Sequence, residues 1–386
     1  MAERGPAPPE LESLLECEVC CERFDPGPRR PRNLPCGHVL CLACVAGLTD
    51  PRSSALACPF CRRPCGARDT SDCRPLRRLL ELLGAPGARG RALPAPAAAA
   101  PAPACYRAIG GWGTLVNPTG LAVCPQTGRV VVVHDGRTRV QIFEAGGGAR
   151  MLQFGAKGDA AQDVRYPLDV AVTADCHVVV TDAGDRSVKV FDFSGRVRLV
   201  FGGGQFSLPW GVETTPQNGL LVTDAEAGSL HLVEADFPAG VLRRSERLHV
   251  RLCSPRGVAV SLLSGAIAIL EQPLPPGTGP CSTRVKVFNP SMQLIGQVDT
   301  FGLSLFFPSR VTASAVTFDQ QGNVIVADMS GPAVLCLGKP EEFPVLKPLV
   351  TEGLTHPVAL AFTKENLLLV LDAGSHSVKV YRFDRE

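Results

Sequence analysis

Between residues 17 and 61, seven of the eight cysteines and one histidine form four close pairs, and this spacing constrains the fold more than any other feature. The eighth cysteine, Cys21, adjoins Cys20 and is expected to be a spare small side chain. Zinc takes four nitrogen or sulfur ligands in a tetrahedron, and a Cys-x-x-Cys turn places two thiolates on one ion. Eight ligands fill two sites and leave no coordination position open, so neither site can activate water. The pairs are Cys17 with Cys20, Cys36 with His38, Cys41 with Cys44, and Cys58 with Cys61.

Four pairs can be shared between two ions in consecutive or in interleaved order. The ligand order and spacing resemble those of the RING finger family, with a LIM or PHD module as the alternative two-zinc fold. The resemblance implies an interleaved cross-brace that holds two structural zinc ions. In that arrangement the first zinc is bound by Cys17, Cys20, Cys41 and Cys44, and the second by Cys36, His38, Cys58 and Cys61.

RING fingers recruit a ubiquitin-conjugating enzyme charged with ubiquitin, and the resemblance implies four contact residues. Val19 lies inside the first pair, Leu48 four residues after the sixth ligand, and Pro59 directly after the seventh. Arg62 follows the last ligand, where active family members place a cation that bridges the enzyme and ubiquitin. A guanidinium suits that role because its donors form a rigid fork. The alternative is that Val19 and Leu48 are core residues and Arg62 is solvated.

Composition limits the class of protein. A chain of 386 residues is expected to hold more than one domain, and a net charge of +2 makes no bulk electrostatic case for nucleic acid. Zinc thiolates need reduced cysteines, which predicts an intracellular compartment. The start of the chain lacks an apolar signal core, and no run of about 18 apolar residues occurs, so no membrane span is expected.

The chain before residue 105 divides into three parts. Residues 1–16 form a lead-in, in which Ser13-Leu14-Leu15-Glu16 predicts a short helix or turn packed on the finger. The finger is assigned to residues 17–66. Residues 67–104 contain a short helix predicted over 76–83, followed by a segment of Ala, Pro, Gly and Arg that predicts a flexible linker.

From residue 105 onward one pattern recurs six times: a proline before a short apolar strand, an aliphatic strand that ends in an acid, and an alternating third strand. The prolines follow one another at steps of 42 to 53 residues, a period that predicts propeller blades. They are Pro118, Pro167, Pro209, Pro255, Pro308 and Pro357. The repeats span about 107–146, 150–194, 198–236, 245–291, 298–338 and 346–386, within a domain of residues 105–386.

The ends of the repeats predict how the ring closes. Most units end in an extra strand that finishes near an aliphatic or aromatic residue plus Gly: Phe154-Gly155, Phe201-Gly202, Phe301-Gly302 and Leu337-Gly338. The last unit lacks this strand, and an unmatched copy at residues 106–110 precedes the first, so we expect that copy to complete the last blade. The pattern resembles NHL repeats, which build six-bladed propellers. The expected fold is a small zinc-stabilised α+β RING finger followed by an all-β six-bladed NHL-repeat propeller.

Several propeller side chains carry specific expectations. The acids that end the second strands are expected to bind local backbone N–H groups rather than a metal: Asp135, Asp182, Asp224, Asp328 and Asp372. Strand alternation predicts that Lys189, Lys286 and Lys379 point into solvent. Trp210, in a glycine-flanked loop, is the candidate substrate-binding residue, with core packing as the alternative. Nothing in the sequence links the single cysteines Cys124, Cys176, Cys253 and Cys336.

A zinc finger followed by an NHL propeller resembles the tripartite-motif ubiquitin ligases, but this chain has no B-box or long coiled coil. The closer resemblance is to the compact RING–NHL ligases, and residues 58–63, 111–118 and 338–344 carry it. It implies a RING-type E3 ubiquitin-protein ligase of glycogen metabolism, with the glycogen phosphatase laforin as partner and glycogen-regulating proteins as substrates for degradation. It also implies a location in the cytoplasm, at the endoplasmic reticulum and in the nucleus.

The expected mechanism uses no covalent intermediate and relies on proximity. The finger recruits the charged enzyme, the propeller recruits substrate, and the linker lets the two swing together. Residues 1–104 contain no lysine and the propeller contains seven, so self-modification is expected on the propeller, first at Lys339 and Lys347.

Two other classes of function remain at this point. The chain could be a non-catalytic adaptor whose finger binds no conjugating enzyme, or a propeller hydrolase with a metal site in its channel. The charge of the propeller weakens the hypothesis that it binds RNA, because residues 105–386 hold 25 Lys and Arg against 26 Asp and Glu.

Overall fold

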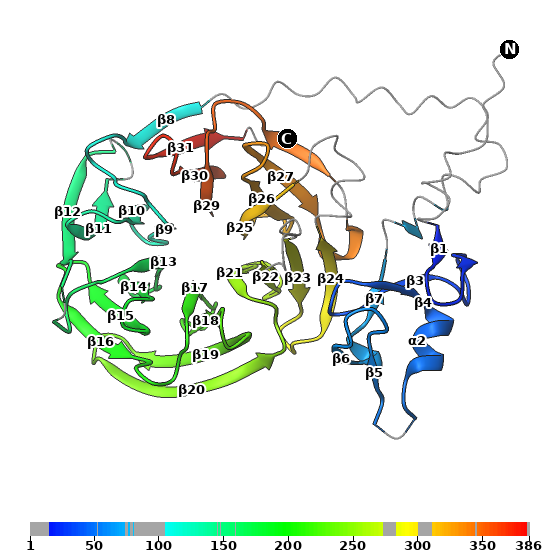
Figure 1. Cartoon of the computed structure of the whole chain (residues 1–386). Coiled ribbons are helices and arrows are strands. Elements are labelled where there is room, and N and C mark those ends of the chain that lie inside the picture. The colour runs from blue at the N-terminus through cyan, green and yellow to red at the C-terminus, as the bar shows by residue number, and fades with distance from the viewer. Residues whose placement is uncertain are drawn as a thin grey trace, which may run out of the picture.

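The computed structural model shows a six-bladed propeller with a small zinc-finger fold beside it (Figure 1). It describes residues 15–51, 53–73, 76–77, 80, 105–144, 146, 148–158, 160–272, 283–299, 311–343 and 346–383. The helix predicted over 76–83 lies mostly outside these residues, and the linker over 84–104, Ser13 and Leu14, Phe301-Gly302 and Pro308 lie wholly outside them. Within the described part, no helix is long and apolar enough to cross a membrane.

The finger consists of short strands around one helix. The strands form a hairpin of β1 and β2, a three-stranded sheet in the order β4-β3-β7, and a second hairpin of β5 and β6. Their interior is small but closed, because Leu34 and Leu40 are fully buried and Val45 and Leu56 nearly so. The elements are β1 (Glu16–Cys17), β2 (Glu22–Arg23), β3 (Pro31–Asn33), β4 (Val39–Cys41), α2 (Leu42–Leu48), β5 (Ala55–Ala57), β6 (Pro64–Gly66), the 3₁₀ turn η1 (Ala67–Asp69) and β7 (Ser71–Asp72).

The propeller is built from six four-stranded antiparallel sheets, numbered here as blades 1 to 6 in chain order. Blade 1 has β9 (Gly120–Val123), β10 (Val130–Val133), β11 (Thr138–Phe143) and β12 (Arg150–Ala156). Blade 2 has β13 (Pro167–Val172), β14 (His177–Asp182), β15 (Ser187–Asp192) and β16 (Val197–Phe201). Blade 3 has β17 (Pro209–Thr214), β18 (Leu220–Asp224), β19 (Ser229–Asp236) and β20 (Val241–Val250).

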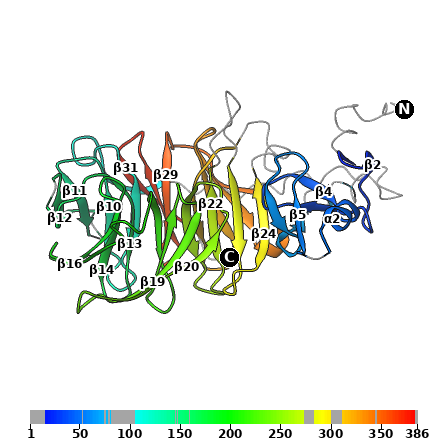
Figure 2. The same cartoon turned by 60° about the horizontal axis from the view of Figure 1, so that its bottom comes forward.

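The remaining three blades complete the ring (Figure 2). Blade 4 has β21 (Pro255–Val260), β22 (Ile267–Glu271), β23 (Arg284–Phe288) and β24 (Leu294–Asp299). Blade 5 has β25 (Ala313–Phe318), β26 (Val324–Asp328), β27 (Ala333–Gly338) and β28 (Lys347–Val350), with the 3₁₀ turn η2 (Pro340–Glu342) before β28. Blade 6 has β29 (Pro357–Phe362), β30 (Leu367–Asp372), β31 (Ser377–Arg382) and β8 (Cys105–Gly110).

The ring closes as the sequence predicts. Strand β8, from the start of the propeller, pairs antiparallel with β31 from its end, with Ile109 opposite Val378. The same arrangement runs around the molecule, because several predicted repeats begin with the outer strand of the preceding blade, as repeat 150–194 begins with β12. Closure pairs the outward edge of β31 with β8, so the last blade has four strands like the others and only a short outer edge remains.

The propeller core lies between neighbouring blades. The second strands are buried along all or nearly all of their length, as in Val130–Val133 of β10 and Val324–Asp328 of β26. A strand that is covered on both faces has no solvent side, which explains why these segments are continuous aliphatic runs rather than alternating ones.

The acids at the ends of the second strands bind backbone N–H groups, as expected. The Asp182 carboxylate accepts from the N–H groups of Arg165 and Tyr166, each at 2.8 Å, and from Gly184 at 2.9 Å. Asp224, Asp328 and Asp372 accept in the same way from the chain that enters their blades.

Blade 1 departs from this expectation, because His134 and not Asp135 holds the corresponding position. His134 Nδ1 accepts from the N–H groups of Val116 and Gly136, at 3.1 and 3.3 Å. Burial lowers the pKa of His134 to about 4, so the ring stays neutral and able to accept. The Asp135 carboxylate instead pairs with the buried Arg139 guanidinium.

The expectation that Lys189, Lys286 and Lys379 are solvated is wrong. Lys189 and Lys286 are 1% and 2% exposed, and Lys379 is mostly covered. The third strands lie between blades, so alternation turns these side chains toward the preceding blade and not toward water. Lys189 and Lys379, for example, also donate to the carbonyl groups of Asp163 and Gly353 in the chain that enters their blades. Each ammonium group pairs with the acid at the end of the neighbouring second strand, Asp182, Glu271 or Asp372.

One assignment of an outer strand is also wrong. Phe154-Gly155 lies in the outer strand β12, and Phe201 ends the outer strand β16, as predicted. Leu337-Gly338, however, ends β27, the third strand of blade 5, and the outer strand is β28. The pattern of an aliphatic or aromatic residue plus Gly thus occurs in the buried third strand β27 as well as in an outer strand, so it does not separate third strands from fourth strands.

Candidate metal centres and propeller channel

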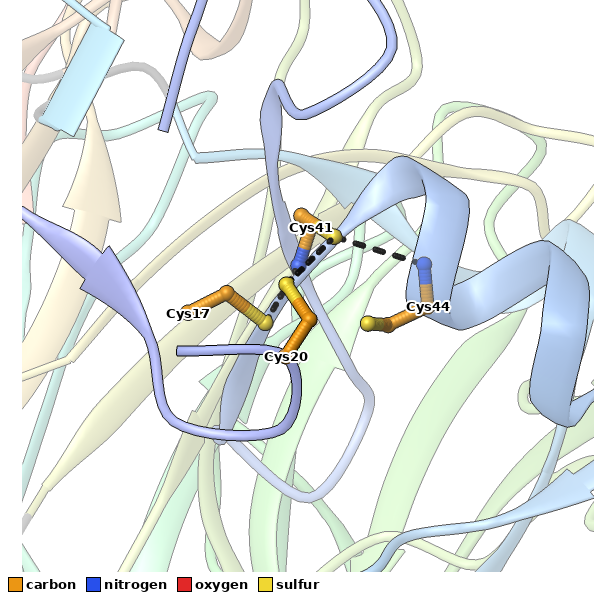
Figure 3. A group of neighbouring side chains, drawn as sticks. All are labelled: Cys17, Cys20, Cys41 and Cys44. Carbon is orange, nitrogen blue, oxygen red and sulfur yellow. Dashed lines mark hydrogen bonds between the residues drawn. The ribbon is translucent and has the colours of Figure 1, made fainter. Parts of the chain in front are cut away.

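The first group of metal ligands gathers where β1, β4 and α2 meet (Figure 3). Cys17 ends β1, Cys20 lies in the turn after it, and Cys41 ends β4 and caps α2, which carries Cys44. Their sulfur atoms lie within 4.8 Å of one another. The N–H of Cys41 donates to Cys17 Sγ and the N–H of Cys44 to Cys41 Sγ, each at 3.3 Å, which are contacts that favour thiolates.

The second group gathers where the connection between β3 and β4 meets the hairpin of β5 and β6. Cys36 and His38 lie between β3 and β4, Cys58 follows β5, and Cys61 lies in the turn before β6, and their ligand atoms also lie within 4.8 Å. His38 presents Nδ1, which is 3.5 Å from both Cys36 Sγ and Cys58 Sγ. Burial, followed by the charge of Arg284, lowers the pKa of His38, which keeps the ring in the neutral form that binds metal.

Backbone geometry aims the paired thiols at one point in two of the three Cys-x-x-Cys segments, those of Cys17 and Cys20 and of Cys58 and Cys61. The residue after the second cysteine takes a positive φ, 54° at Cys21 and 57° at Arg62. Each of these residues donates its N–H to the carbonyl of the first cysteine of the turn, at 2.7 and 2.8 Å. The two turns thus repeat one conformation, which a non-glycine residue adopts only under outside constraint.

The grouping is interleaved, with the first and third pairs in one cluster and the second and fourth in the other. The finger therefore holds two structural zinc ions, one in each four-ligand cluster. Such closed sites stabilise the fold and supply no reactive metal. In the described part of the chain no third group of three metal-ligating side chains occurs, so the hydrolase alternative has no metal site there.

The four residues predicted to contact a conjugating enzyme all lie on the finger. Leu48, at the end of α2, is 41% exposed, and Pro59 and Arg62 in the second cysteine turn are exposed as well. Val19 is half-buried and packs against the finger core. Phe60, between Pro59 and Cys61, was not predicted; it is 39% exposed and its ring lies 5.1 Å from that of His38.

Trp210 lies in the first strand of blade 3, β17, at the central channel, so the expectation that it occupies a loop is wrong. A cavity of about 900 Å³ runs between the first strands of the six blades, and Trp210 lines it with the Arg256 guanidinium 4.3 Å from its ring. Two acids in this channel were missed by sequence reasoning, since each sits in an ordinary-looking first strand. Burial raises the pKa of Asp169 and of Glu213 to about 7.

Two cysteines that seemed unrelated in the sequence are neighbours in space. Cys124 and Cys176 lie in equivalent turns of blades 1 and 2, with their sulfur atoms 3.5 Å apart. Their separation of 52 residues is close to one blade period, and that was the available hint.

Comparisons with known proteins agree with both parts of the molecule. The family described as zinc-RING finger domain matches residues 16–63. The human E3 ubiquitin-protein ligase NHLRC1 is 70% identical over 390 residues, covering 99% of this chain and 98% of the relative. The human E3 ubiquitin-protein ligase TRIM32 is 29% identical over 69% of this chain and 42% of its own length.

Among solved structures, virginiamycin B lyase from Staphylococcus aureus matches 72% of this chain and 99% of its own with a TM-score of 0.51. At 11% identity this likeness supports the propeller fold alone. The two zinc clusters, the RING match and the 70% identity along nearly the whole length lead to one conclusion. The chain belongs to the NHLRC1 (malin) family of RING-type E3 ubiquitin-protein ligases.

Proposed function

We propose that the finger docks the charged conjugating enzyme through Val19, Leu48, Pro59 and Arg62, while the propeller holds the substrate. The observation that supports this is exposure: Leu48, Pro59 and Arg62 stay accessible although the finger packs against the propeller. An apolar side chain and a proline beside a free guanidinium suit a partner that offers both an apolar loop and a charged tail.

Transfer then depends on placement alone. The lysine amine of the substrate attacks the thioester between ubiquitin and the enzyme, the carbon–sulfur bond breaks, and an isopeptide bond and a free thiol result. Arg62 would hold ubiquitin against the enzyme, so the thioester spends more time in a reactive geometry. Effective concentration from such positioning is a large source of rate enhancement, and no side chain of this protein needs to become a nucleophile.

For the substrate side, we propose that the part of the channel lined by Trp210 is the binding surface. A large aromatic ring held by a cation is a common anchor of protein interfaces. By resemblance, laforin is the proposed partner and glycogen-regulating proteins the substrates, marked for degradation. Isothermal titration of purified laforin into the protein and into its Trp210→Ala variant tests this. Equal binding by the two proteins, or no binding by either, would refute it.

The thiolate clusters also support a reducing compartment as the place of action: the cytoplasm, including the surface of the endoplasmic reticulum, and the nucleus. Imaging of the tagged protein tests this, and finding it inside the secretory pathway would refute it.

The main experiment is ubiquitin transfer in vitro with a panel of conjugating enzymes. The wild type is compared with Cys20→Ala, Arg62→Ala and the matched control Arg68→Ala, an exposed arginine of the same finger. Cys20→Ala removes a zinc ligand, so the finger should unfold and ubiquitin transfer should be lost. A hydrogen bond to a charged group contributes about 1.5–3 kcal/mol, so Arg62→Ala should slow transfer about tenfold or more.

Arg68→Ala should transfer ubiquitin as the wild type does. If the wild type binds two zinc ions yet transfers nothing with any conjugating enzyme, the adaptor alternative replaces the recruitment proposal. If Arg62→Ala and Arg68→Ala are equally active, Arg62 has no bridging role.

A further inference from the structure

Blade 4 differs from its neighbours at two paired positions, and one of the two residues contacts the finger. In blades 2, 3, 5 and 6 the acid that ends the second strand is Asp, and the residue opposite it is Ser or Ala. In blade 4 the acid is the longer Glu271, and the residue opposite it is Arg284. The small residues opposite the acid in the other blades are Ser187, Ser229, Ala333 and Ser377.

Arg284 explains both changes. Its guanidinium lies 3.2 Å from the Glu271 carboxylate, whose other oxygen binds Lys286 Nζ at 2.9 Å. The same guanidinium donates to two carbonyl groups of the finger, Cys36 O at 2.7 Å and Pro35 O at 3.3 Å. Glutamate is long enough to hold two cations, and the second cation reaches out of the blade to the loop of the second zinc site.

The finger is shaped to receive this side chain. Gly37 has a φ of +94°, and a Cβ at this position would lie 1.8 Å from Arg284 Nη2, so only glycine leaves room for the guanidinium. Gln297, buried in β24, points Nε2 at Leu34 O at 3.5 Å. Arg63, next to the last zinc ligand pair, donates to Cys253 Sγ at 3.0 Å.

We infer that Arg284 is a positioning residue that locks the finger onto blade 4 in one orientation. The expectation that the linker lets the finger and the propeller swing together is therefore replaced by a fixed joint, in which β24 lies against the finger in both views (Figures 1 and 2). The joint leaves Leu48, Pro59 and Arg62 exposed, so it is compatible with enzyme docking. The inference rests on the proposed recruitment of a charged conjugating enzyme by the finger.

A fixed joint decides which lysines the thioester can reach. Lys339 and Lys347 are exposed in blade 5, and η2, which Lys339 precedes, packs against β24 of blade 4. Lys157 is also exposed, but it follows β12 of blade 1, on the opposite side of the ring (Figure 1). A finger held on blade 4 should thus direct self-modification to Lys339 and Lys347 and spare Lys157.

The test maps self-modification by mass spectrometry in the full-length wild type, Arg284→Ala and Gln297→Ala. Arg284→Ala leaves Glu271 paired with Lys286, so blade 4 keeps its buried carboxylate neutralised. The matched control is Arg243→Ala, whose exposed pair with Asp236 lies in blade 3 away from the finger. Discharge of the charged enzyme onto free lysine is measured in parallel, because it needs only the finger.

In the wild type and Arg243→Ala we expect modification at Lys339 and Lys347. In Arg284→Ala the ratio of Lys157 to Lys347 modification should rise several-fold, and the radius of gyration from X-ray scattering should increase, while zinc content and free-lysine discharge stay unchanged. Gln297→Ala should move the same two readouts in the same direction by less.

The outcomes separate the two proposals. No discharge by the wild type with any conjugating enzyme would defeat the recruitment proposal. Normal discharge by Arg284→Ala with an unchanged lysine map and unchanged scattering would overturn the joint alone. Loss of zinc or discharge in Arg284→Ala would also overturn it, since Arg284 would then stabilise the finger itself rather than position it.

Discussion

Buried ion pairs recur in the blades of this protein. Lys189 and Asp182 are nearly inaccessible to water, and their side chains meet at 2.8 Å between two blades. A buried ion pair of this kind contributes little net stability as a pair, but either partner left alone is costly. The same arrangement recurs with Glu271 and Asp372, so the effect belongs to the repeat and not to one site.

Replacement of Lys189 by methionine should therefore destabilise the propeller by about 3–5 kcal/mol, because Asp182 would stay buried without its cation. The matched change Arg243→Ala breaks an exposed ion pair and should cost about 0–1 kcal/mol. Urea unfolding followed by tryptophan fluorescence measures both, since the two tryptophans of the chain lie in the propeller. A loss below about 1 kcal/mol in Lys189→Met would mean that this lysine is solvated after all.

The same pairs predict how stability depends on pH. Burial alone would raise the pKa of Asp372, but the Lys379 ammonium and the N–H groups of His356 and Thr355 outweigh it and hold that pKa below its usual value. The unfolded chain then binds a proton more readily than the folded one. The resulting stability is complete above the ordinary aspartate pKa of about 4 and is lost as the pH falls through the lower folded value.

Asp372→Asn should remove this share of the acid sensitivity. We expect the variant to be less stable than the wild type at neutral pH, with a flatter decline of its unfolding free energy below about pH 4. Urea midpoints read by tryptophan fluorescence at several pH values provide the comparison. Parallel curves for the two proteins would show that Asp372 has no depressed pKa.

At the scale of elements, strand β8 is the piece that closes the ring. It comes first in the propeller sequence, yet it is the outer strand of the last blade, and Ile109 on it is 1% exposed in the core shared with blade 1. Without β8 the strand β31 would present an unpaired edge, which is prone to pair with other chains.

A truncated chain that begins at residue 111 should therefore unfold at a lower temperature and form oligomers, compared with a chain that begins at residue 104 and keeps β8. Both lack the finger, so the comparison isolates closure. Thermal unfolding and size-exclusion chromatography measure the two effects. Equal melting temperatures and equal elution volumes would show that the ring closes without β8.

At the scale of the molecule, the finger and the propeller carry different functional groups but contact each other directly. The zinc ligands all lie on the finger, whereas the seven lysines all lie on the propeller. The contacts of Arg284 and Gln297 set the angle between the two bodies. If that joint and not the linker decides the orientation, the composition of residues 84–104 should hardly matter.

We predict that replacing residues 84–104 with a Gly/Ser segment of equal length leaves the map of modified lysines unchanged. A segment of this length spans up to about 70 Å when extended, so it would let a free finger reach many sites. Mass spectrometry of the self-modified protein gives the map. A spread of modification to Lys157 in this variant, like that expected for Arg284→Ala, would contradict the prediction.

The sequence by itself determined the features that depend on local spacing. The four ligand pairs indicate two closed zinc sites because coordination chemistry limits their number, and the recurring proline, aliphatic strand and acid indicate six blades because each unit cannot bury its apolar face alone. The sequence also predicts the closing strand, because the last repeat lacks an outer strand and one unmatched strand precedes the first repeat.

Only the tertiary structure decided what lies between blades and between domains. Alternation along one strand says which residues share a face, but not whether that face meets water, so the lysines were assigned to solvent and Asp135 was assigned the role of His134. The contact of Arg284 with the finger joins residues that are 248 positions apart. Their closeness results from how the ring and the finger pack, and no local pattern records it.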